Sequence, residues 1–212
     1  MPQWGVTEYK FYSKEKEVIQ DFQKKVIEYT KNFGVPPNDA DQYLGNILIK
    51  FKVETEESLK EKALNSWIKE IKKSILQKEG YYYFSLLTDD IWHPHPEFFK
   101  KILKEYYKEK IQMAYIMSDT DCGVFKKYDI ENLFYENVEF ALDYYIPNEA
   151  DPKYWRLENL PLDLSLNQLK SFFEANSYEE VMQKINDWNE ELQDYEDEGF
   201  IELHEIKNIA II

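Results

Sequence analysis

The sequence predicts an α+β fold of the ferredoxin-like sandwich type, with helices on one face of a mixed or antiparallel sheet, followed by an acidic helical C-terminal extension. Strand-type and helix-type patterns alternate along residues 1–146, and residues 81–117 have the pattern of a β-α-β crossover. The charge also changes along the chain, because residues 131–212 hold 20 Asp+Glu against 5 Lys+Arg. We therefore expect an α+β domain over residues 1–146 and an acidic, helix-rich region over residues 147–212 that packs on the same domain.

The chain begins with a predicted strand and an amphipathic helix. Residues 4–12 alternate loosely between apolar and polar side chains, which is typical of a strand. From Val18 to Phe33, apolar residues recur at spacings of three and four, which places them on one face of a helix. Gly34, followed by two prolines, predicts the end of this helix.

A second strand and a second helix are predicted next. Apolar residues alternate with other residues over 47–53, which predicts a strand with one buried face. Thr55 is a favourable N-cap, and apolar residues then follow one helical face from Leu59 to Ile75. Gly80 predicts the end of this second helix.

Residues 81–117 carry the predicted crossover. The aromatic-rich run over 81–87 predicts a strand that breaks at Thr88. Pro96 has the place of the first residue of a helix, where proline is favoured. The helix leads to a second predicted strand over residues 111–117.

Three later segments have extended or ambiguous patterns. Residues 123–130 are predicted to be extended, whereas residues 138–146 could be a strand or a helix. The apolar composition of residues 200–212 predicts a final strand.

Two C-terminal helices carry clear start signals. Ser165 with Gln168, and Ser177 with Glu180, fit the capping box, in which two side chains satisfy each other's backbone N–H groups. An apolar stripe follows on the second helix: Val181, Ile185, Trp188, Leu192 and Tyr195. This stripe predicts a face that packs on the protein's own core or, alternatively, a face that receives a partner helix.

The composition argues against several classes of protein. The chain has 212 residues, a net charge of -15 and one cysteine, Cys122. A single cysteine excludes an internal disulfide framework and fits the reducing cytoplasm, so we expect a cytoplasmic protein. No apolar run reaches the length of a membrane span, which argues against a membrane partner. The negative charge, without a basic stripe beside an aromatic platform, argues against direct binding of nucleic acid.

Two segments resemble a known family. The first is Met1-Pro2-Gln3-Trp4, and the second is Phe84-Ser85-Leu86-Leu87-Thr88-Asp89-Asp90-Ile91-Trp92-His93-Pro94-His95-Pro96. Within residues 1–12 and 81–130, they resemble the Met-Pro-Asn-Trp start and the Phe-x-Thr-x-Trp-x-Pro-Pro segment of the YubB ferredoxin-like family of bacterial plasmids and phages. The resemblance implies a ferredoxin-like fold and a mobile-element setting. It implies no catalytic residues, because that family has no agreed activity.

The residues after the two crossover strands form a candidate metal or acid-base site. In a right-handed β-α-β crossover, both strands end at the same edge of the sheet, so the residues that follow them meet there. Their oxygen and imidazole groups suit a divalent metal, and the candidate ligands are Asp89, His93, His95 and Asp119. Alternatively, the prolines fix the entry into the helix and the aspartates are ordinary turn residues, with no cofactor bound.

The acidic C-terminal region is a candidate partner-binding surface. Carboxylates around aromatic side chains can attract a basic protein and then hold it. The residues that form this pattern are Asp187, Trp188, Glu190, Glu191, Asp194, Tyr195, Glu196, Asp197 and Glu198. We therefore expect a non-catalytic module that binds a basic protein, as an inhibitor, an immunity protein or a nucleic-acid mimic does.

Two other functions are compatible with the sequence. A small metal-assisted hydrolase or transferase would use the candidate metal site at the sheet edge. An assembly component would be held by the apolar stripe from Val181 to Tyr195. The sequence contains no established catalytic motif, which favours a protein that is not an enzyme.

Overall fold

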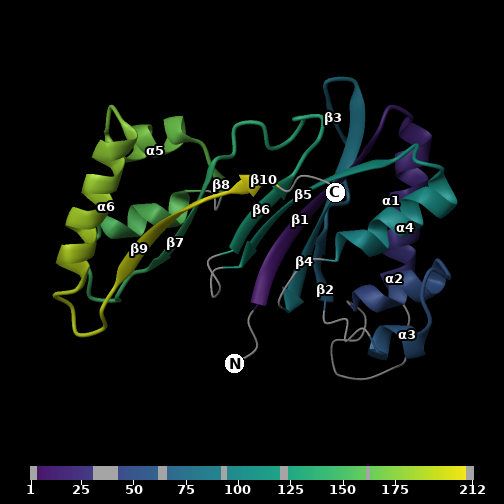
Figure 1. Ribbon diagram of the computed structural model, residues 1–212, viewed down its shortest axis with the longest axis horizontal. Helices are drawn as coiled ribbons and strands as arrows, with labels where there is room; N and C mark the ends of the chain where they lie inside the picture. Colours follow the sequence, from purple (N-terminus) through teal and green to yellow (C-terminus); the bar gives the residue numbers. More distant parts are fainter. Residues whose placement is uncertain are drawn as a thin grey trace. The chain divides into compact units, whose positions relative to one another are not determined.

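The chain forms two compact units in a computed structural model, which describes residues 4–30, 43–61, 66–91, 95–119, 124–160 and 163–208 (Figure 1). The N-terminal unit is Met1–Phe134 with Ala210–Ile212, and the C-terminal unit is Tyr135–Ile209. Each unit combines helices with antiparallel strands, so the α+β class is confirmed. The division precedes the boundary expected after residue 146, because a strand that begins at Phe140 pairs within the C-terminal unit.

The N-terminal unit is built on a five-stranded antiparallel sheet in the order β6-β5-β1-β4-β2, and the short strand β3 pairs with β4 as a hairpin. Its elements are β1 (Trp4–Ser13), α1 (Lys16–Thr30), α2 (Leu44–Lys50), α3 (Glu56–Glu61), β2 (Ser66–Ile71), β3 (Leu76–Lys78), β4 (Tyr81–Ile91), α4 (Pro96–Tyr107), β5 (Gln112–Asp119) and β6 (Val124–Tyr128).

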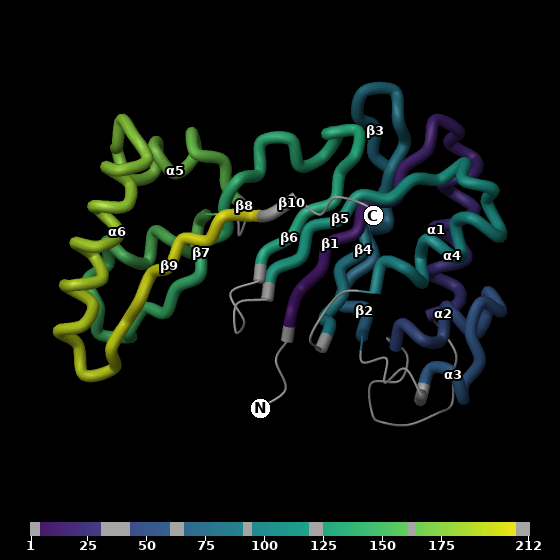
Figure 2. Tube along the Cα trace, in the orientation of Figure 1, coloured from purple at the N-terminus to yellow at the C-terminus, as the bar shows by residue number. Residues whose placement is uncertain are grey.

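Strand β1 lies at the centre of this sheet. Its neighbours β4 and β5 both run antiparallel to it, so they run parallel to each other. The chain leaves β4, passes through α4 and returns to β5 on the other side of β1 (Figure 2). The crossover predicted over residues 81–117 is therefore present, with β1 inserted between its two strands. Both strands run past their predicted ends, to Ile91 and Asp119.

Aromatic side chains form the core between the sheet and the helices. Phe11 of β1 and Phe84 of β4 pair across the sheet and are fully buried. The ring of Phe11 lies 5.0 Å from the ring of Phe22 on α1 and 5.0 Å from the ring of Phe99 on α4. Edge-to-face contacts of this kind add to the stabilisation from burial. Helices α1 and α4 are therefore held against the same face of the sheet.

Helices α1 and α4 agree with the sequence pattern. Helix α1 buries the predicted apolar residues Phe22 and Val26, and the stop predicted at Gly34 lies outside the described residues. Helix α4 begins at Pro96 as predicted. Proline is favourable there because the first backbone N–H groups of a helix have no acceptor within the helix.

The strand predicted over residues 47–53 is wrong, because Leu44–Lys50 form helix α2. Leu44, Ile47 and Leu48 lie at helical spacing, and all three are fully buried. In a short apolar run, alternation and helical spacing occur together, so the period by itself does not separate the two structures.

The helix predicted from Leu59 to Ile75 is also wrong. Helix α3 ends at Glu61, and Ser66–Ile71 form strand β2, which pairs with β4. This long-range pairing outweighs the local helical spacing. Gly80 ends no helix but lies in the β3–β4 turn with a φ of 82°, a left-handed conformation that favours glycine.

The C-terminal unit has its own three-stranded sheet, in the order β8-β7-β9, and its own hydrophobic core. Its elements are β7 (Phe140–Tyr145), the 3-10 helix η2 (Tyr154–Asn159), β8 (Asp163–Leu164), α5 (Leu166–Phe173), α6 (Tyr178–Leu192), β9 (Phe200–Glu205) and β10 (Lys207–Asn208). The ambiguous segment over residues 138–146 is therefore a strand, and the predicted strand after residue 200 is confirmed.

The two predicted capping boxes differ. At Ser165 the box is complete, because the Ser165 hydroxyl accepts from the Gln168 N–H and the Gln168 side chain accepts from the Ser165 N–H. At Ser177 the hydroxyl accepts from the Glu180 N–H at 3.2 Å. The Glu180 carboxylate, however, accepts from the N–H of Asn176 at 2.7 Å, so this box is half formed.

The apolar stripe of α6 packs on the core of its own unit, which confirms the first of the two expectations for it. Val181, Ile185 and Leu192 are buried. The half-buried ring of Trp188 lies 5.3 Å from the ring of Phe173 on α5. The stripe is therefore covered within the C-terminal unit.

We expect Phe11→Ala to lower the free energy of unfolding of the N-terminal unit by about 3–5 kcal/mol, because it leaves a cavity where α1, α4 and the sheet meet. Urea unfolding followed by circular dichroism would measure this loss, and hydrogen exchange of the β1 amides would localise it. Leu76→Ala is the control, since Leu76 is 49% exposed on β3. Equal losses in the two variants would contradict the central role of Phe11.

Candidate functional site

Strands β4 and β5 end on either side of the beginning of β1. Val6 of β1 pairs with Asp89 of β4 on one side and with Ser118 of β5 on the other. The ends of the two crossover strands are thus brought to one edge of the sheet. Of the predicted metal ligands, Asp89 and His95 are described, whereas His93 and the side chain of Asp119 lie outside the described residues.

Asp89 and Asp90 lie on opposite faces of β4, as successive strand residues do. Asp90 shares the helix-covered face with Phe84 and is completely buried. Asp89 lies on the other face and is half-buried. Its carboxylate Oδ1 is 3.2 Å from Nζ of Lys69 on β2. The Asp89 carboxylate is therefore paired with a cation from the neighbouring strand.

His95 is buried immediately before α4. Its ring lies 5.7 Å from the ring of Phe98, and its Nδ1 lies 3.3 Å from a carboxylate oxygen of Glu97. Within the described ranges, no group of three His, Cys, Asp or Glu side chains is placed to hold a metal ion. In this part of the edge, Asp89 pairs with Lys69 and His95 with Glu97.

The Asp90 carboxylate joins three strands through hydroxyl groups. It accepts hydrogen bonds from Thr7 of β1 at 2.6 Å, from Thr88 of β4 at 2.8 Å and from Ser66 of β2. Burial raises the pKa of Asp90 above its ordinary value of 3.8, and the three hydroxyl donors and His95 oppose this change. Because the raising effect is larger, the protein holds a proton at Asp90 more tightly than an exposed aspartate would.

The Tyr9 hydroxyl lies near this carboxylate without a hydrogen-bond partner among the described residues. Burial raises the pKa of Tyr9 well above its ordinary value of 10.0, and the Asp90 charge raises it further. The backbone N–H of His95 acts in the opposite direction on this pKa, but it does not meet hydrogen-bond geometry with the Tyr9 hydroxyl. An unpaired buried hydroxyl costs about 1–3 kcal/mol.

This buried cluster can hold a proton, but its carboxylate is not open to a substrate from solvent. Thr7, Ser66, Thr88, Tyr9 and Asp90 all have no exposed surface. Sequence analysis missed this arrangement, because it placed Ser66 in a predicted helix and Asp90 in a turn. Strand alternation puts Thr7 and Tyr9 on one face, but their proximity to residue 90 depends on long-range pairing.

In the C-terminal unit, the two aromatic residues of the predicted partner-binding set contribute to the fold. The Trp188 ring lies 5.2 Å from the ring of Tyr154 and 5.3 Å from the ring of Phe173. The Tyr195 hydroxyl accepts from the backbone N–H of Asp151 at 3.1 Å. Both side chains are half-buried in these contacts.

Two carboxylates of the predicted set also have partners within the unit. Glu191 contacts the ammonium group of Lys153 and accepts from the Tyr154 hydroxyl at 2.6 Å. These hydrogen bonds, with that of Lys153 the larger, lower the pKa of Glu191. Asp187 accepts from the Gln183 amide at 2.7 Å.

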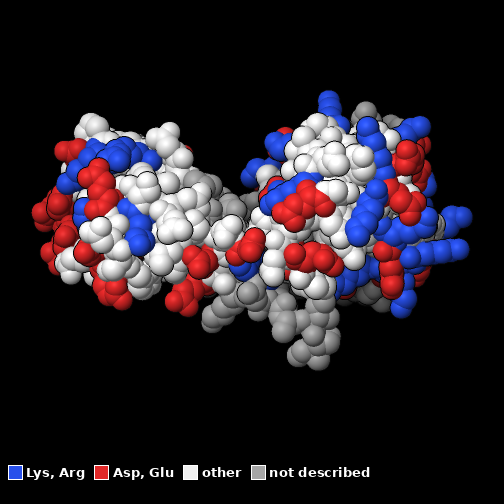
Figure 3. Space-filling model, turned by 90° about the horizontal axis from the view of Figure 1, so that it is seen from above, with Lys and Arg blue, Asp and Glu red and all other residues white. Residues whose placement is uncertain are grey.

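The other five carboxylates of the predicted set are exposed, and no Lys, Arg or His of the described residues pairs with them. We call this group the acidic cluster: Glu190, Asp194, Glu196, Asp197 and Glu198. It covers the end of α6 and the loop that follows. In Figure 3 acidic side chains are abundant on the C-terminal unit, at the left of the view.

An exposed aromatic pair, which sequence analysis missed, follows the acidic cluster in the chain. Tyr145 of β7 pairs with Phe200 of β9, and these residues are 45% and 39% exposed. Gly199 separates Phe200 from Glu198, and a Cβ there would lie 2.9 Å from the carbonyl oxygen of Tyr145. Glycine thus permits the close approach of the two strands next to the cluster. The feature of the sequence that could have indicated this pair is the position of Phe200 at the end of the acidic run.

No model of a known protein family matches the chain, and no curated protein or solved structure gives a significant match. The resemblance to the YubB family therefore rests on the sequence segments themselves.

The described helices include none with the length and apolar character that crossing a membrane requires.

The stability of the protein should depend on pH through Asp90. Because the folded-state pKa is raised, the contribution of Asp90 is most favourable below its unfolded value near 3.8 and is lost as the pH rises through the folded value. We expect the wild type to lose stability relative to Asp90→Asn as the pH rises above about 4, the ordinary pKa of aspartate, until Asp90 is ionised in the folded protein. Urea midpoints of both proteins at each pH would measure this difference, in which the other carboxylates cancel. A constant difference would contradict a raised pKa.

Proposed function

We propose that the protein is a non-catalytic binding module whose C-terminal unit engages a basic protein, in the manner of an inhibitor, an immunity protein or a nucleic-acid mimic. The observation that carries this proposal is the acidic cluster, whose five carboxylates are exposed and unpaired among the described residues. A dense group of negative charges on one surface attracts a basic partner over a distance of about one Debye length, roughly 8–10 Å at physiological salt.

The acidic cluster lies where it is unfavourable for the fold. Helix α6 ends at Leu192 and has no basic residue in its last turn, which contains Glu190 and Glu191. A negative side chain near a helix C-terminus opposes the helix dipole, at a cost of about 0.3–1 kcal/mol at an exposed position. Glu191 is compensated by Lys153, but Glu190 has no such partner among the described residues. Solubility alone does not require carboxylates at this position, so their placement supports a binding role.

The exposed pair of Tyr145 and Phe200 supplies an apolar contact beside the charges. Interfaces gain most of their energy from a few buried aromatic anchors, whereas surrounding charges govern the rate of encounter and the choice of partner. The half-buried Trp188 and Tyr195 are held in the fold, so the exposed pair takes the anchor role that sequence analysis gave to them. The proposed binding surface is therefore the acidic cluster together with Tyr145 and Phe200.

The fold and the setting of the protein belong to the same proposal. A crossover whose strands lie on either side of a third strand is typical of the split β-α-β arrangement in ferredoxin-like sandwiches, and we propose that the N-terminal unit is a variant of this class. The resemblance to the YubB family supports a mobile-element setting. The single cysteine supports a cytoplasmic location.

The test compares charge reversal inside and outside the acidic cluster. The first variant is Glu190, Glu196 and Asp197→Lys, and the control is Glu149, Glu158 and Glu174→Lys, which changes the net charge equally at other exposed positions of the unit. Tagged proteins would capture partners from host lysate at low and high salt. We expect one basic protein to bind the wild type and the control at low salt and to be lost with the cluster variant.

The captured protein would then be purified and its association rate measured directly. We expect the rate to fall steeply with added salt, because steering acts through a screened field. Phe200→Ala should raise the dissociation rate with little effect on this salt dependence. Equal losses in the cluster variant and the control, or binding that salt does not affect, would overturn the proposed function.

A further inference from the structure

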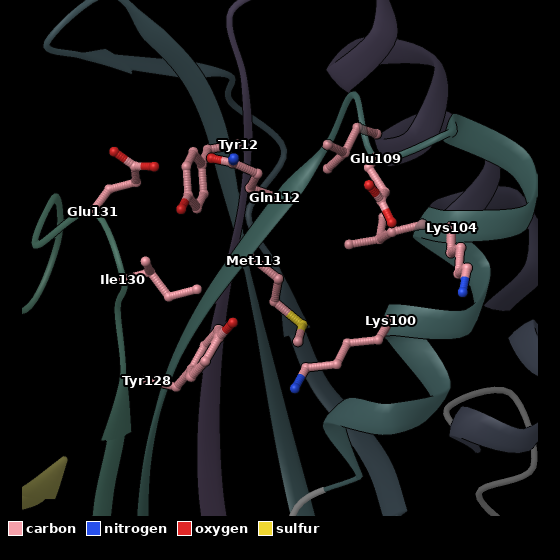
Figure 4. A pocket seen from close by; sticks show the side chains of 11 residues that line it. Tyr12, Lys100, Lys104, Glu109, Gln112, Met113, Tyr128, Ile130 and Glu131 are labelled. Atoms are coloured by element: carbon pink, nitrogen blue, oxygen red, sulfur yellow. The ribbon is translucent and has the colours of Figure 1, made fainter. Parts of the chain in front are cut away.

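A hollow of about 390 Å³ lies beside α4 in the N-terminal unit (Figure 4). This volume falls within the range of about 300–1,000 Å³ that is usual for small-molecule sites. Buried apolar side chains line it, including Leu103 of α4 and Ile111 and Met113 at β5. The ring of Tyr128 on β6 forms another part of the lining. The hollow therefore has the apolar surface that a ligand with an apolar body requires.

One wall of the hollow carries cations without carboxylate partners. Lys100 of α4 points across the hollow in Figure 4, and its Nζ lies 4.9 Å from the centroid of the Tyr128 ring. Lys104 lies one turn further along the same helix. In the described part of the chain, neither ammonium group forms an ion pair. The Lys100 ammonium group thus lies beside the hollow and over the face of the Tyr128 ring, which stabilises its charge.

The remaining rim is acidic and apolar. Figure 4 shows Glu131 on the opposite side of the hollow from Lys100, beside Ile130. Ile130 is 62% exposed, which is more than any other large apolar side chain of the described residues. At the end of α4, Lys108 and Glu109 have positive φ angles of 47° and 63°. Left-handed conformations are unfavourable in residues other than glycine, and Glu109 lines the hollow.

We propose that this hollow binds a small carboxylate with an apolar body, such as an arylalkanoic acid. The acid group pairs with Lys100, and the apolar body covers Met113 and Tyr128 under the side chain of Ile130. Glu131 and Glu109 fix the direction of the ligand, because they repel a carboxylate at their end of the hollow. This site belongs to the N-terminal unit and does not depend on the acidic cluster.

The charge pattern selects this ligand class over a neutral or a cationic one. A neutral ligand of the same shape would gain the apolar contacts but would leave the Lys100 ammonium unpaired. A cationic ligand would be repelled by Lys100. Because Lys100 is exposed, its ion pair with the ligand corresponds to a preference of up to about fivefold for the carboxylate over its neutral analogue.

The experiment uses three probes of the same shape and different charge: 4-phenylbutyrate, 4-phenylbutyramide and 4-phenylbutylamine. Calorimetric titration of the full chain would give the affinities, and amide chemical shifts would locate the site. We expect 4-phenylbutyrate to bind up to about fivefold tighter than the amide, and the amine to bind most weakly. The largest shifts should occur at Lys100, Met113, Tyr128 and Ile130.

Three variants at exposed positions test the assignment without disturbing the core. Lys100→Gln should reduce the affinity for 4-phenylbutyrate to that for the amide, and Ile130→Ala should weaken the binding of both probes by the same factor. Lys24→Gln is the control for net charge, since Lys24 is exposed on α1 and does not line the hollow. The proposal is overturned if 4-phenylbutyrate does not bind saturably, if the shifts lie elsewhere, or if Lys24→Gln weakens binding as much as Lys100→Gln.

Discussion

The N-terminal unit depends on the position of β1 between β4 and β5. Because β1 pairs along both of its edges, it holds together two strands that the chain connects through α4. Its helix-facing residues Tyr9 and Phe11 are fully buried, and both rings contact the ring of Phe99 on α4. A strand in this position satisfies its backbone groups on both sides and buries its largest side chains at the same time. Without β1, the ends of β4 and β5 would not meet at one edge of the sheet.

Carboxylates occur in two opposite environments in this protein. Asp90 is buried, and hydroxyl groups from three strands compensate the loss of water around it. The acidic cluster of the C-terminal unit is exposed, has no basic partners among the described residues and lies at the unfavourable end of α6. The first arrangement joins three strands through hydrogen bonds within the fold, whereas the second adds nothing to it. Because of this contrast, the acidic cluster is a better candidate for a functional surface than Asp90.

The two units also differ in the surface that they offer to other molecules. The N-terminal unit has a concave apolar surface with Lys100 directed across it, and this geometry suits a small ligand. The C-terminal unit has an exposed aromatic pair next to a cluster of charges, and this geometry suits a protein partner. In both places, a charged group lies beside an apolar surface. In both proposals, charge selects the partner and the apolar surface provides the energy of binding.

Features that depend on neighbouring residues could be predicted from the sequence. Pro96 predicted the start of α4, Ser165 predicted the start of α5, and the stripe from Val181 to Leu192 predicted the buried face of α6. The charged residues of the acidic cluster were also visible in the sequence, since their exposure needs no distant contact.

Features that depend on contacts between distant parts of the chain could be seen only in the tertiary structure. It made a helix of the alternating residues at Leu44–Lys50, made a strand of Ser66–Ile71, and brought Ser66 and Thr7 to Asp90. The hollow beside α4 and the pairing of Tyr145 with Phe200 also depend on contacts between residues far apart in the chain. Local periodicity indicates which residues are suited to burial, but contacts between residues far apart in the chain determine which element covers them.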